Sequence, residues 1–351
     1  MGYDIGVIPG DGIGTAVTEA AIDVLDRAAE IYGFETTWTH YDWGSHRYLE
    51  SGAMMPADGT DQLSTHDSIF LGAVGHPDIP DHVTLHGLLL PIRKEFDQYV
   101  CKRPNVLFEG IESPLRGYDA GEIDFVVYRE NTEGEYSDLG GREHVGHQHD
   151  FAVQTAGFTR HGTERIVRRA FEAAQERERH LTSVTKSNAQ RHSMVFWDDI
   201  VERVSDDFPE IDMERLLVDR ASMELVRRPE DFDVIVASNL FGDILTDIGA
   251  IVTGSLGIAP SANINPEGEF PSLFEPVHGS APDIAGEGIA NPLAAVLSGA
   301  MMLEHLEEGE AASALWTAVE AQLAAGDPRT PDLGGDETTD AVVDDLLDRL
   351  R

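Results

Sequence analysis

One short stretch, residues 232–248, restricts the possible folds more than any other part of the chain. Residues 232–237 form an apolar run rich in β-branched side chains, which is typical of a buried strand in a parallel sheet. The polar pair Ser238-Asn239 follows, and polar residues of this kind often begin a helix. Apolar residues then recur at helical spacing: Leu240, Ile244 and Ile248. The stretch therefore predicts a strand that turns directly into a helix, as in α/β proteins.

Two carboxylates on this helix suggest chemistry. Asp243 and Asp247 are four residues apart, so their side chains lie one turn apart on the same face. Like charges at this spacing repel each other, and a shared cation at the mouth of an α/β sheet would remove the repulsion. A solvated acidic face explains the spacing equally well, and both interpretations stay open.

The same alternation of strands and helices continues along the chain. We expect strands at residues 3–8, 34–41, 68–75, 123–128, 181–188 and 215–219. We expect helices at residues 15–32, 163–177, 194–208 and 291–306, and a final helix capped by Thr338 or Thr339. After Gly257 the sequence becomes rich in loop residues up to the helix at 291. The pattern predicts an α/β fold.

The charge balance restricts the possible partners. The chain has 64 acidic and 25 basic residues, for a formal net charge of -39. Nucleic acid and anionic membranes are excluded as partners because this charge repels phosphates. The single cysteine, Cys101, cannot form an internal disulfide, and no segment has the apolar length of a membrane span. We therefore expect a cytoplasmic protein.

The acidity also predicts a dependence on salt, as in proteins of halophiles. At roughly 1 M salt the screening length falls to about 3 Å, so the repulsion between surface carboxylates no longer opposes folding. We expect the urea midpoint to rise steeply between dilute buffer and molar KCl. Full stability in dilute buffer would refute the expectation.

The few basic residues mark a second candidate site. Arg93, Arg103 and Arg129 lie next to predicted strands and turns, and guanidiniums at separate positions can each hold one carboxylate of a small dicarboxylate. Each of them could equally well balance a neighbouring acid. Lys186 is one of only three lysines, and lysine, unlike arginine, can give up its proton.

Other motifs carry weaker signals. The glycines of residues 10–14 are one residue short of a dinucleotide fingerprint, so a structural turn is the default. His278-Gly279-Ser280 is a loop of small residues that could wrap a flat heterocycle, and Asp283 could accept hydrogen bonds from a ribose. The three histidines of residues 144–149 have no acidic or cysteine partner at ligand spacing, which favours a surface ribbon over a metal site.

Together, five motifs resemble the β-decarboxylating dehydrogenases, the family of isocitrate and 3-isopropylmalate dehydrogenases. They span most of the chain in the order expected for the family: residues 9–14, 185–188, 239–247, 275–283 and 290–292. Within the family, residues 43–44, 54–56, 80–83, 89–93 and 96–99 are most similar to the branch that acts on tartrate and D-malate.

The resemblance implies roles for particular residues. Asp243 and Asp247, with Asp219 of a second subunit, would hold Mg²⁺ or Mn²⁺, and K⁺ is a further possible ion. Arg93, Arg103 and Arg129 would bind the substrate carboxylates, and Tyr136 and Lys186 would move protons. The residues that would bind NAD are Asn188, Glu275, His278, Gly279, Ser280, Ala281, Pro282, Asp283 and Asn291.

The resemblance also implies the architecture. We expect a two-domain, doubly wound α/β fold, with residues 1–98 and 256–351 in a large cofactor-binding domain and residues 99–255 in a small domain. A dimerisation arm would cover about residues 138–155, in a homodimer that can pair into a tetramer.

The implied activity is the NAD-dependent oxidative decarboxylation of a small 2-hydroxy dicarboxylate such as D-malate or tartrate. 3-Isopropylmalate is the alternative substrate, because an apolar wall at residues 88–90 could face an isopropyl group and one methylene changes selectivity by only about 1–3 kcal/mol. A nucleotide-binding regulatory paralogue without catalysis is a remote alternative. A phosphoryl-transfer enzyme would need a glycine-rich loop that ends in lysine, and the sequence has no such loop.

Overall fold

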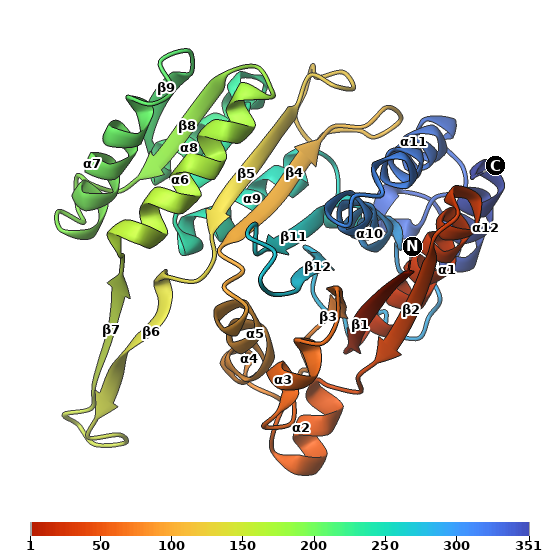
Figure 1. The fold of residues 1–351 in the computed structure, drawn as a ribbon, viewed down its shortest axis with the longest axis horizontal. Helices are drawn as coiled ribbons and strands as arrows, with labels where there is room; N and C mark the ends of the chain where they lie inside the picture. The colour runs from red at the N-terminus through yellow and green to blue at the C-terminus, as the bar shows by residue number, and fades with distance from the viewer. Residues whose placement is uncertain (1, 351) are drawn as a thin grey trace.

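A ten-stranded mixed sheet runs through the whole molecule (Figure 1). The computed structural model describes residues 2–350. The strands of the sheet are β1 (Gly2–Gly10), β2 (Glu35–His40), β3 (Ser68–Ala73), β4 (Val100–Val106), β5 (Asp124–Glu130), β8 (His180–Thr185), β9 (Asp212–Leu217), β10 (Val234–Ala237), β11 (Pro260–Ile264) and β12 (Ser272–Pro276). Their spatial order is β2-β1-β3-β12-β11-β4-β5-β10-β8-β9.

The sheet consists of two parallel halves joined by antiparallel strands. The strands from β2 to β12 are parallel to one another, and so are those from β5 to β9. Between the halves, β11 is antiparallel to both β12 and β4, and β4 is antiparallel to β5. The strands of the two halves therefore run in opposite directions, and the middle strands belong to neither parallel set.

Helices cover both faces of the sheet. The helices are α1 (Gly14–Tyr32), α2 (Ser45–Ser51), α3 (Gly59–Leu63), α4 (Asp81–Thr84), α5 (Leu90–Glu95), α6 (Arg160–Gln175), α7 (Ser193–Ser205), α8 (Val218–Arg227), α9 (Asn239–Val252), α10 (Leu293–His305), α11 (Gly309–Ala325) and α12 (Thr339–Arg349). A π-helical turn (Leu85–Leu89) joins α4 to α5, and 3-10 turns cover Pro229–Asp231, Leu256–Ile258 and Pro331–Leu333.

The core has three parts. The first surrounds α10, which is buried at every residue from Leu293 to Leu303 and packs against α1 and α11. The second lies between helices α6, α7, α8 and α9 and strands β4, β5, β8, β9 and β10. The third lies beneath α2, α3 and α5. A helix that is apolar on all sides, such as α10, is stable only when it is surrounded by protein, so it forms the centre of its half.

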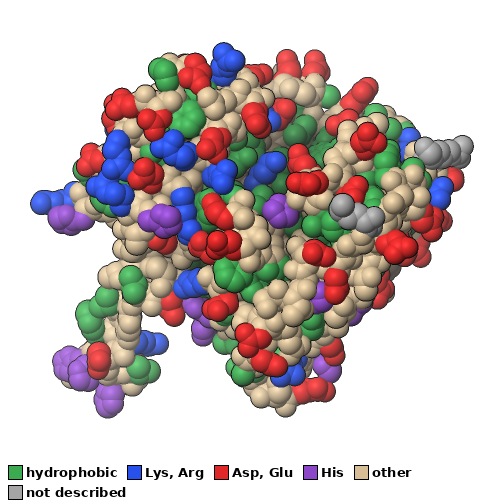
Figure 2. Space-filling view, viewed as in Figure 1, with side chains coloured by type: hydrophobic (Ala, Val, Ile, Leu, Met, Phe, Trp, Pro, Cys, Tyr) green, Lys and Arg blue, Asp and Glu red, His purple; other side chains and the backbone are tan. Residues whose placement is uncertain are grey.

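A two-stranded arm leaves the body of the molecule. Strands β6 (Gly134–Glu143) and β7 (Phe151–Gly157) form an antiparallel hairpin that points away from the sheet (Figure 1). Histidines gather at its tip (Figure 2). The prediction of a surface ribbon around the three histidines is therefore confirmed. In residues 2–350 no three His, Cys, Asp or Glu side chains are grouped as metal ligands.

Most of the expected elements are present, but two expectations are wrong and several helices were not predicted, α11 among them. The stretch after Gly257 contains two buried strands, β11 and β12, instead of loops. Helix α11 follows an acidic segment that gave no helical signal of its own. Asp219 lies in the first turn of α8 instead of at the end of a strand. The cap of the last helix is confirmed, since Thr338 accepts a hydrogen bond from the backbone N–H of Ala341.

No helix in residues 2–350 is both long and apolar enough to cross a membrane. The domain boundaries at residues 98 and 255 stay a prediction. They place β4 and β5 in one domain and β11 and β12 in the other, so the sheet would continue across the boundary.

Candidate functional site

The candidate site lies on one face of the middle strands. Directly opposed residues in neighbouring strands share a face of the sheet. The register pairs Cys101 with Arg129 and with Asn263, and Ser261 with Glu275. Arg103 lies two residues after Cys101 and so faces the same way. Asp243 joins these side chains from α9, which begins directly after the parallel strand β10, so the site combines a strand end, as the sequence suggested, with one face of the antiparallel middle strands.

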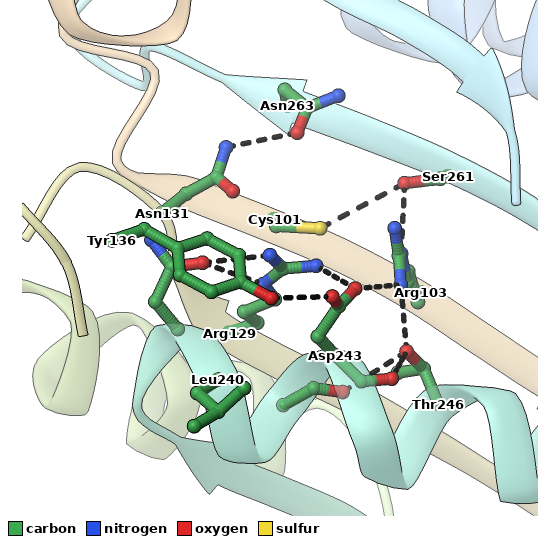
Figure 3. Close-up of polar contacts among 12 residues, drawn as sticks. Cys101, Arg103, Arg129, Asn131, Tyr136, Leu240, Asp243, Thr246, Ser261 and Asn263 are labelled. Atoms are coloured by element: carbon green, nitrogen blue, oxygen red, sulfur yellow. Dashed lines mark hydrogen bonds and ion pairs between the residues drawn. The ribbon is translucent and has the colours of Figure 1, made fainter. Parts of the chain in front are cut away.

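Arg129 is the most enclosed of the three guanidiniums, at 1% exposed. Its Nε and Nη2 donate to Oδ1 of Asn239 over 3.0 and 2.7 Å, and its Nη1 donates to the carboxylate of Asp243 (Figure 3). Gly242 makes this approach possible, because a Cβ there would lie 2.7 Å from the Arg129 side chain. The first turn of α9 therefore packs against the Arg129 side chain.

Arg103 reaches the same carboxylate from β4. Its Nη1 lies 3.3 Å from Oδ1 of Asp243 and donates to the hydroxyl of Thr246 over 2.7 Å. Its Nε donates to the hydroxyl of Ser261 over 3.2 Å, and Cys101 lies 3.7 Å from that hydroxyl (Figure 3). Two guanidiniums thus converge on Asp243.

Arg93 approaches from α5 and is also buried. Its Nη2 donates to Glu275 over 2.6 Å, and Asn263 donates to the same carboxylate oxygen over 2.8 Å. The Nε of Arg93 is buried and has no hydrogen-bond partner in the described part of the chain. A buried donor without a partner costs about 1–3 kcal/mol, so this N–H suits a ligand oxygen.

These side chains line one cavity of about 190 Å³. The three arginines, Tyr136 and Asp243 form its polar wall, and the π-helical turn supplies an apolar wall through Leu85 and Leu89. Residues 71–74 and 275–279 close it from the ends of β3 and β12. The sequence predicted that the arginines meet at a small-anion site, and the structure brings all three into this cavity.

The ionisation of the polar wall follows from its neighbours. Burial opposes the charge of Asp243, but the guanidiniums of Arg129 and Arg103 outweigh it and lower the pKa of this carboxyl to about 2. Burial and the nearby Asp243 raise the pKa of Tyr136 to about 12. The Tyr136 hydroxyl donates to Oδ2 of Asp243 over 2.9 Å. At neutral pH Tyr136 is therefore a protonated phenol at the edge of the cavity.

Asp243 and Asp247 suit a hard cation. Burial and the charge of Asp243 raise the pKa of Asp247, which indicates that the two carboxylates lie close enough to repel each other. Oxygen ligands of this kind are preferred by Mg²⁺ and Mn²⁺. One chain brings only these two together, because no group of three ligating side chains exists within residues 2–350. The donor set fits a cation that takes a further ligand from elsewhere.

Lys186 and Asp219 form a separate pair. The Nζ of Lys186, just after β8, donates to the carboxylate of Asp219 in α8. Neither residue contributes to the cavity lined by the arginines. Within one chain, the structure therefore separates these two candidates from the other catalytic and metal candidates.

Acid titration tests the charge of Asp243. Its pKa is depressed in the folded protein, so its stabilising contribution is present above the ordinary value of 3.8 and is lost as pH falls towards 2. The side chain is 36% exposed, so after allowance for solvent screening we expect a loss of about 1 kcal/mol. The free energy of unfolding of the wild type, measured with urea, should fall between pH 4 and pH 2 more steeply than that of D243N. Parallel pH profiles would contradict the expectation.

A second cavity, of about 390 Å³, lies beside the loop at residues 278–286. Ile13, Leu256, Ile284 and Ile289 give it apolar walls, and Asn291 and His278 also line it. The Nε2 of His278 is buried without a partner, and burial lowers the pKa of this imidazole. An apolar slot with few polar groups suits an adenine ring. Asp283 lies on the exposed part of the same loop and does not line the slot.

The remaining cofactor candidates lie in different places. Glu275 is 5% exposed and paired with Arg93, so it lies in the arginine cavity. Gly279 also lines that cavity, and the backbone oxygen of Ser280 accepts from Ile13 over 2.8 Å. Ala281, Pro282 and Asn188 line neither cavity.

The glycine-rich turn after β1 has a role that sequence reasoning missed. Asp11 is buried and accepts hydrogen bonds from the backbone N–H and hydroxyl of Ser45 and from the N–H of Gly75. A Cβ on Gly12 would lie 2.0 Å from the oxygen of Ser280. The turn therefore holds the loop at residues 278–286 against the end of β3. The short glycine spacing gave the only signal, and it suggested a structural turn.

Comparison with known proteins settles the family. The family model for isocitrate/isopropylmalate dehydrogenase matches residues 4–346. This chain belongs to that family. Its solved structures include isocitrate dehydrogenase from Methylococcus capsulatus, which superposes with a TM-score of 0.90 at 34% identity and covers 99% of both chains. The predicted isocitrate/isopropylmalate dehydrogenase fold is thus confirmed.

Two curated relatives belong to one branch of the isocitrate/isopropylmalate dehydrogenase family. The D-malate dehydrogenase [decarboxylating] of Escherichia coli (strain K12) is 52% identical over 348 residues, which cover 97% of this chain and 96% of the relative. The tartrate dehydrogenase/decarboxylase of Pseudomonas putida is 48% identical over 360 residues, covering 99% and 98%. The resemblance to the tartrate and D-malate branch inferred from the motifs is confirmed.

Proposed function

We propose that this protein oxidises and decarboxylates a small 2-hydroxy dicarboxylate, D-malate or tartrate, with NAD and a divalent cation. The observation that carries the proposal is the convergence of three buried guanidiniums on one small cavity. Guanidiniums are the preferred partners of carboxylates because they can donate two parallel hydrogen bonds. A dicarboxylate is therefore the ligand that best matches this charge.

The apolar wall of the cavity favours a four-carbon substrate over a branched one. The cavity has about 190 Å³. Leu85 and Leu89 already occupy the apolar side, so an isopropyl branch would compete with them for space. The two curated relatives, which are named for D-malate and tartrate, support the same choice over 3-isopropylmalate.

The chain's own residues would bind the substrate and move its protons. Arg93, Arg103 and Arg129 would fix the carboxylates and thereby orient the hydroxyl-bearing carbon. Lys186 of a second subunit would take the proton from the hydroxyl. Tyr136, protonated at neutral pH, would donate a proton to the carbon that loses CO₂. For D-malate the products would be pyruvate and CO₂.

Two groups would complete the site. Asp243 and Asp247 would hold Mg²⁺ or Mn²⁺ together with Asp219 of a second subunit, and the slot beside His278 and Asn291 would hold the adenosine of NAD. When bound, the cation supplies Lewis acidity at the substrate oxygens, and NAD supplies the hydride acceptor. The separation of Lys186 and Asp219 from the cavity within one chain is what such a shared site requires.

A homodimer would explain the exposed apolar side chains. Met223 and Val226 of α8 and Ile244 and Ile251 of α9 are 47–63% exposed. On the arm, Leu139, Val145 and Phe151 are also exposed. A lone two-stranded hairpin is barely stable in water, and an apolar one needs a partner. The molar mass in molar KCl, measured by light scattering, should be that of a dimer or of a pair of dimers.

NADH production tests the activity. Initial rates in molar KCl with Mn²⁺ should be measured for D-malate, tartrate and 3-isopropylmalate. We expect the highest kcat/KM with D-malate or tartrate. A higher value with 3-isopropylmalate would assign the protein to the other branch, and the absence of NADH with all three would refute the proposal.

The charge of Asp283 is expected to select NAD over NADP. Asp283 is an exposed carboxylate on the loop beside the adenosine slot, where it would repel a 2′-phosphate. Replacing Asp283 by lysine should shift the ratio of kcat/KM for NADP to that for NAD upward by about tenfold or more. Asp336 is also exposed but lies outside the loop at residues 278–286, so D336K is a matched control. An unchanged ratio in D283K would count against the ribose contact.

A further inference from the structure

The guanidinium of Arg129 is held by an uncharged acceptor. Its Nε and Nη2 both donate to the same amide oxygen of Asn239, over 3.0 and 2.7 Å. Both side chains are 1% exposed, so solvent cannot replace this contact. The Asn239 amide is fixed in turn, since its Nδ2 donates to the backbone oxygen of Glu133 over 3.2 Å. The amide thus fixes Nε and Nη2, and Nη1 points towards Asp243 (Figure 3).

An aspartate would accept the same two N–H groups and would bind the guanidinium more strongly, although it could not donate to the backbone oxygen of Glu133. A carboxylate oxygen accepts the same two N–H donors in a charge-assisted hydrogen bond. Asn239 is also the first residue of α9, and helix N-termini favour negative charge. The chain has 64 acidic residues, yet an uncharged side chain occupies this position. The donation to Glu133 is one reason for an amide at this position, and the charge that a neutral acceptor leaves on the guanidinium is a second.

The helix start takes its negative charge from another residue. The carboxylate of Glu135 in β6 accepts from the backbone N–H of Leu240 over 3.2 Å and from the hydroxyl of Ser238 over 2.9 Å. Arg103 shows the same pattern as Arg129, because the hydroxyls of Thr246 and Ser261 hold it. For both arginines, Asp243 is the carboxylate in contact within residues 2–350.

We propose that Asn239 is a positioning residue for substrate binding and that its neutrality is the property the site requires. It fixes Arg129 through two hydrogen bonds and leaves the positive charge of the guanidinium available to a substrate carboxylate. The inference rests on the proposed function, because a substrate carboxylate must enter the cavity. When Asp243 binds a cation, Arg129 keeps no other carboxylate partner, and the attraction for the substrate is largest.

The N239D variant separates positioning from charge. It keeps the shape of the side chain and the oxygen that accepts both N–H groups, but it removes the Nδ2 donor to Glu133 and adds a negative charge next to the guanidinium. We expect a melting temperature close to that of the wild type, because the ion pair with Arg129 offsets the lost hydrogen bond, a KM for D-malate or tartrate about 10- to 100-fold higher, and an unchanged Kd for NADH. If Asn239 only held the guanidinium in place, aspartate would hold it as well and KM would not change.

Two further variants complete the series. N239A removes the amide oxygen that accepts from both Nε and Nη2 of Arg129, so it should lower the melting temperature and kcat/KM together. Asn265 is also buried, at 2% exposed, and its side chain hydrogen-bonds backbone atoms only. N265D therefore controls for a new buried charge away from the guanidiniums, and we expect a lower melting temperature with an unchanged KM.

A binding measurement keeps the test independent of turnover. Malonate is an unreactive dicarboxylate, and it should raise the melting temperature of the wild type in proportion to its affinity but that of N239D much less. A KM within threefold of the wild type and an equal malonate shift in N239D would overturn the inference. If the wild type binds malonate but oxidises no hydroxy acid, the proposed function fails. The malonate shifts of the wild type and N239D then still test whether Asn239 positions Arg129 for carboxylate binding. Absence of both turnover and malonate binding in the wild type would overturn both proposals.

Discussion

The K186A variant is expected to lose turnover, with kcat lowered by about 10²- to 10⁴-fold, while the Kd for NADH stays that of the wild type. Lys186 lies just after β8, and its ammonium contacts Asp219 in α8. Neither residue touches the cavity of its own chain, so removal of the side chain leaves the cavity walls unchanged. Single-turnover rates of NADH formation at saturating substrate measure the effect.

An arginine at the same position distinguishes charge from proton transfer. K186R can keep an ion pair with Asp219, but a guanidinium stays protonated at any pH at which the protein is folded. We therefore expect K186R to be nearly as inactive as K186A. The matched control is K102R, because Lys102 lies on the opposite face of the sheet, 3.7 Å from Glu304. Activity in K186R close to that of the wild type would remove Lys186 from proton transfer.

Removal of the divalent cation is expected to have the second large effect. Dialysis against EDTA in molar KCl should lower kcat by roughly 10³-fold, because Lewis acidity at the substrate oxygens is worth several kcal/mol and each 1.36 kcal/mol is tenfold in rate. Titration with Mn²⁺ or Mg²⁺ should restore the rate. Binding of NADH to the EDTA-treated protein should not change, since its slot lies beside His278 and Asn291.

The D243N variant links this effect to the chain's own residues. It removes one carboxylate from the proposed cation site, so the Mn²⁺ concentration that gives half-maximal activity should rise at least tenfold. Full activity of a metal-free sample would contradict the cation site altogether. A normal Mn²⁺ requirement in D243N would move the site away from α9.

The sequence predicts the alternating strands and helices better than it predicts the strands in the middle of the sheet. The strand at 232–237 and the helix after it are predicted well, because a buried parallel strand is an unbroken apolar run. By contrast, β11 and β12 contain Pro260, Asn263 and Glu275, which read as loop residues. Glu275 lines the cavity and Asn263 donates to the Glu275 carboxylate, so tertiary position and not local propensity makes these residues strands.

For the site, the types of residue in the sequence helped to predict which side chains belong to it. The pairs that these side chains form in the structure could not be predicted. Three arginines next to predicted strands and turns pointed to the cavity, and all three line it. Glu275 was expected to bind the cofactor, and its pairing with Arg93 depends on a strand that local sequence does not indicate. Asn239 stood out only as a helix start, since no local pattern reveals that its amide meets an arginine 110 positions earlier in the chain.

The order of strands in the sheet has a consequence for synthesis on the ribosome. Strand β3 pairs with β12, and Ser68 lies opposite Ser272. The three strands β1, β2 and β3 therefore lack the strand that lies beside β3 until most of the chain has been made. The strands β4, β5, β8, β9 and β10 come from one uninterrupted segment, and their mutual pairings can form before β11 emerges. A nascent chain should therefore gain protease resistance in its middle before its first hundred residues do.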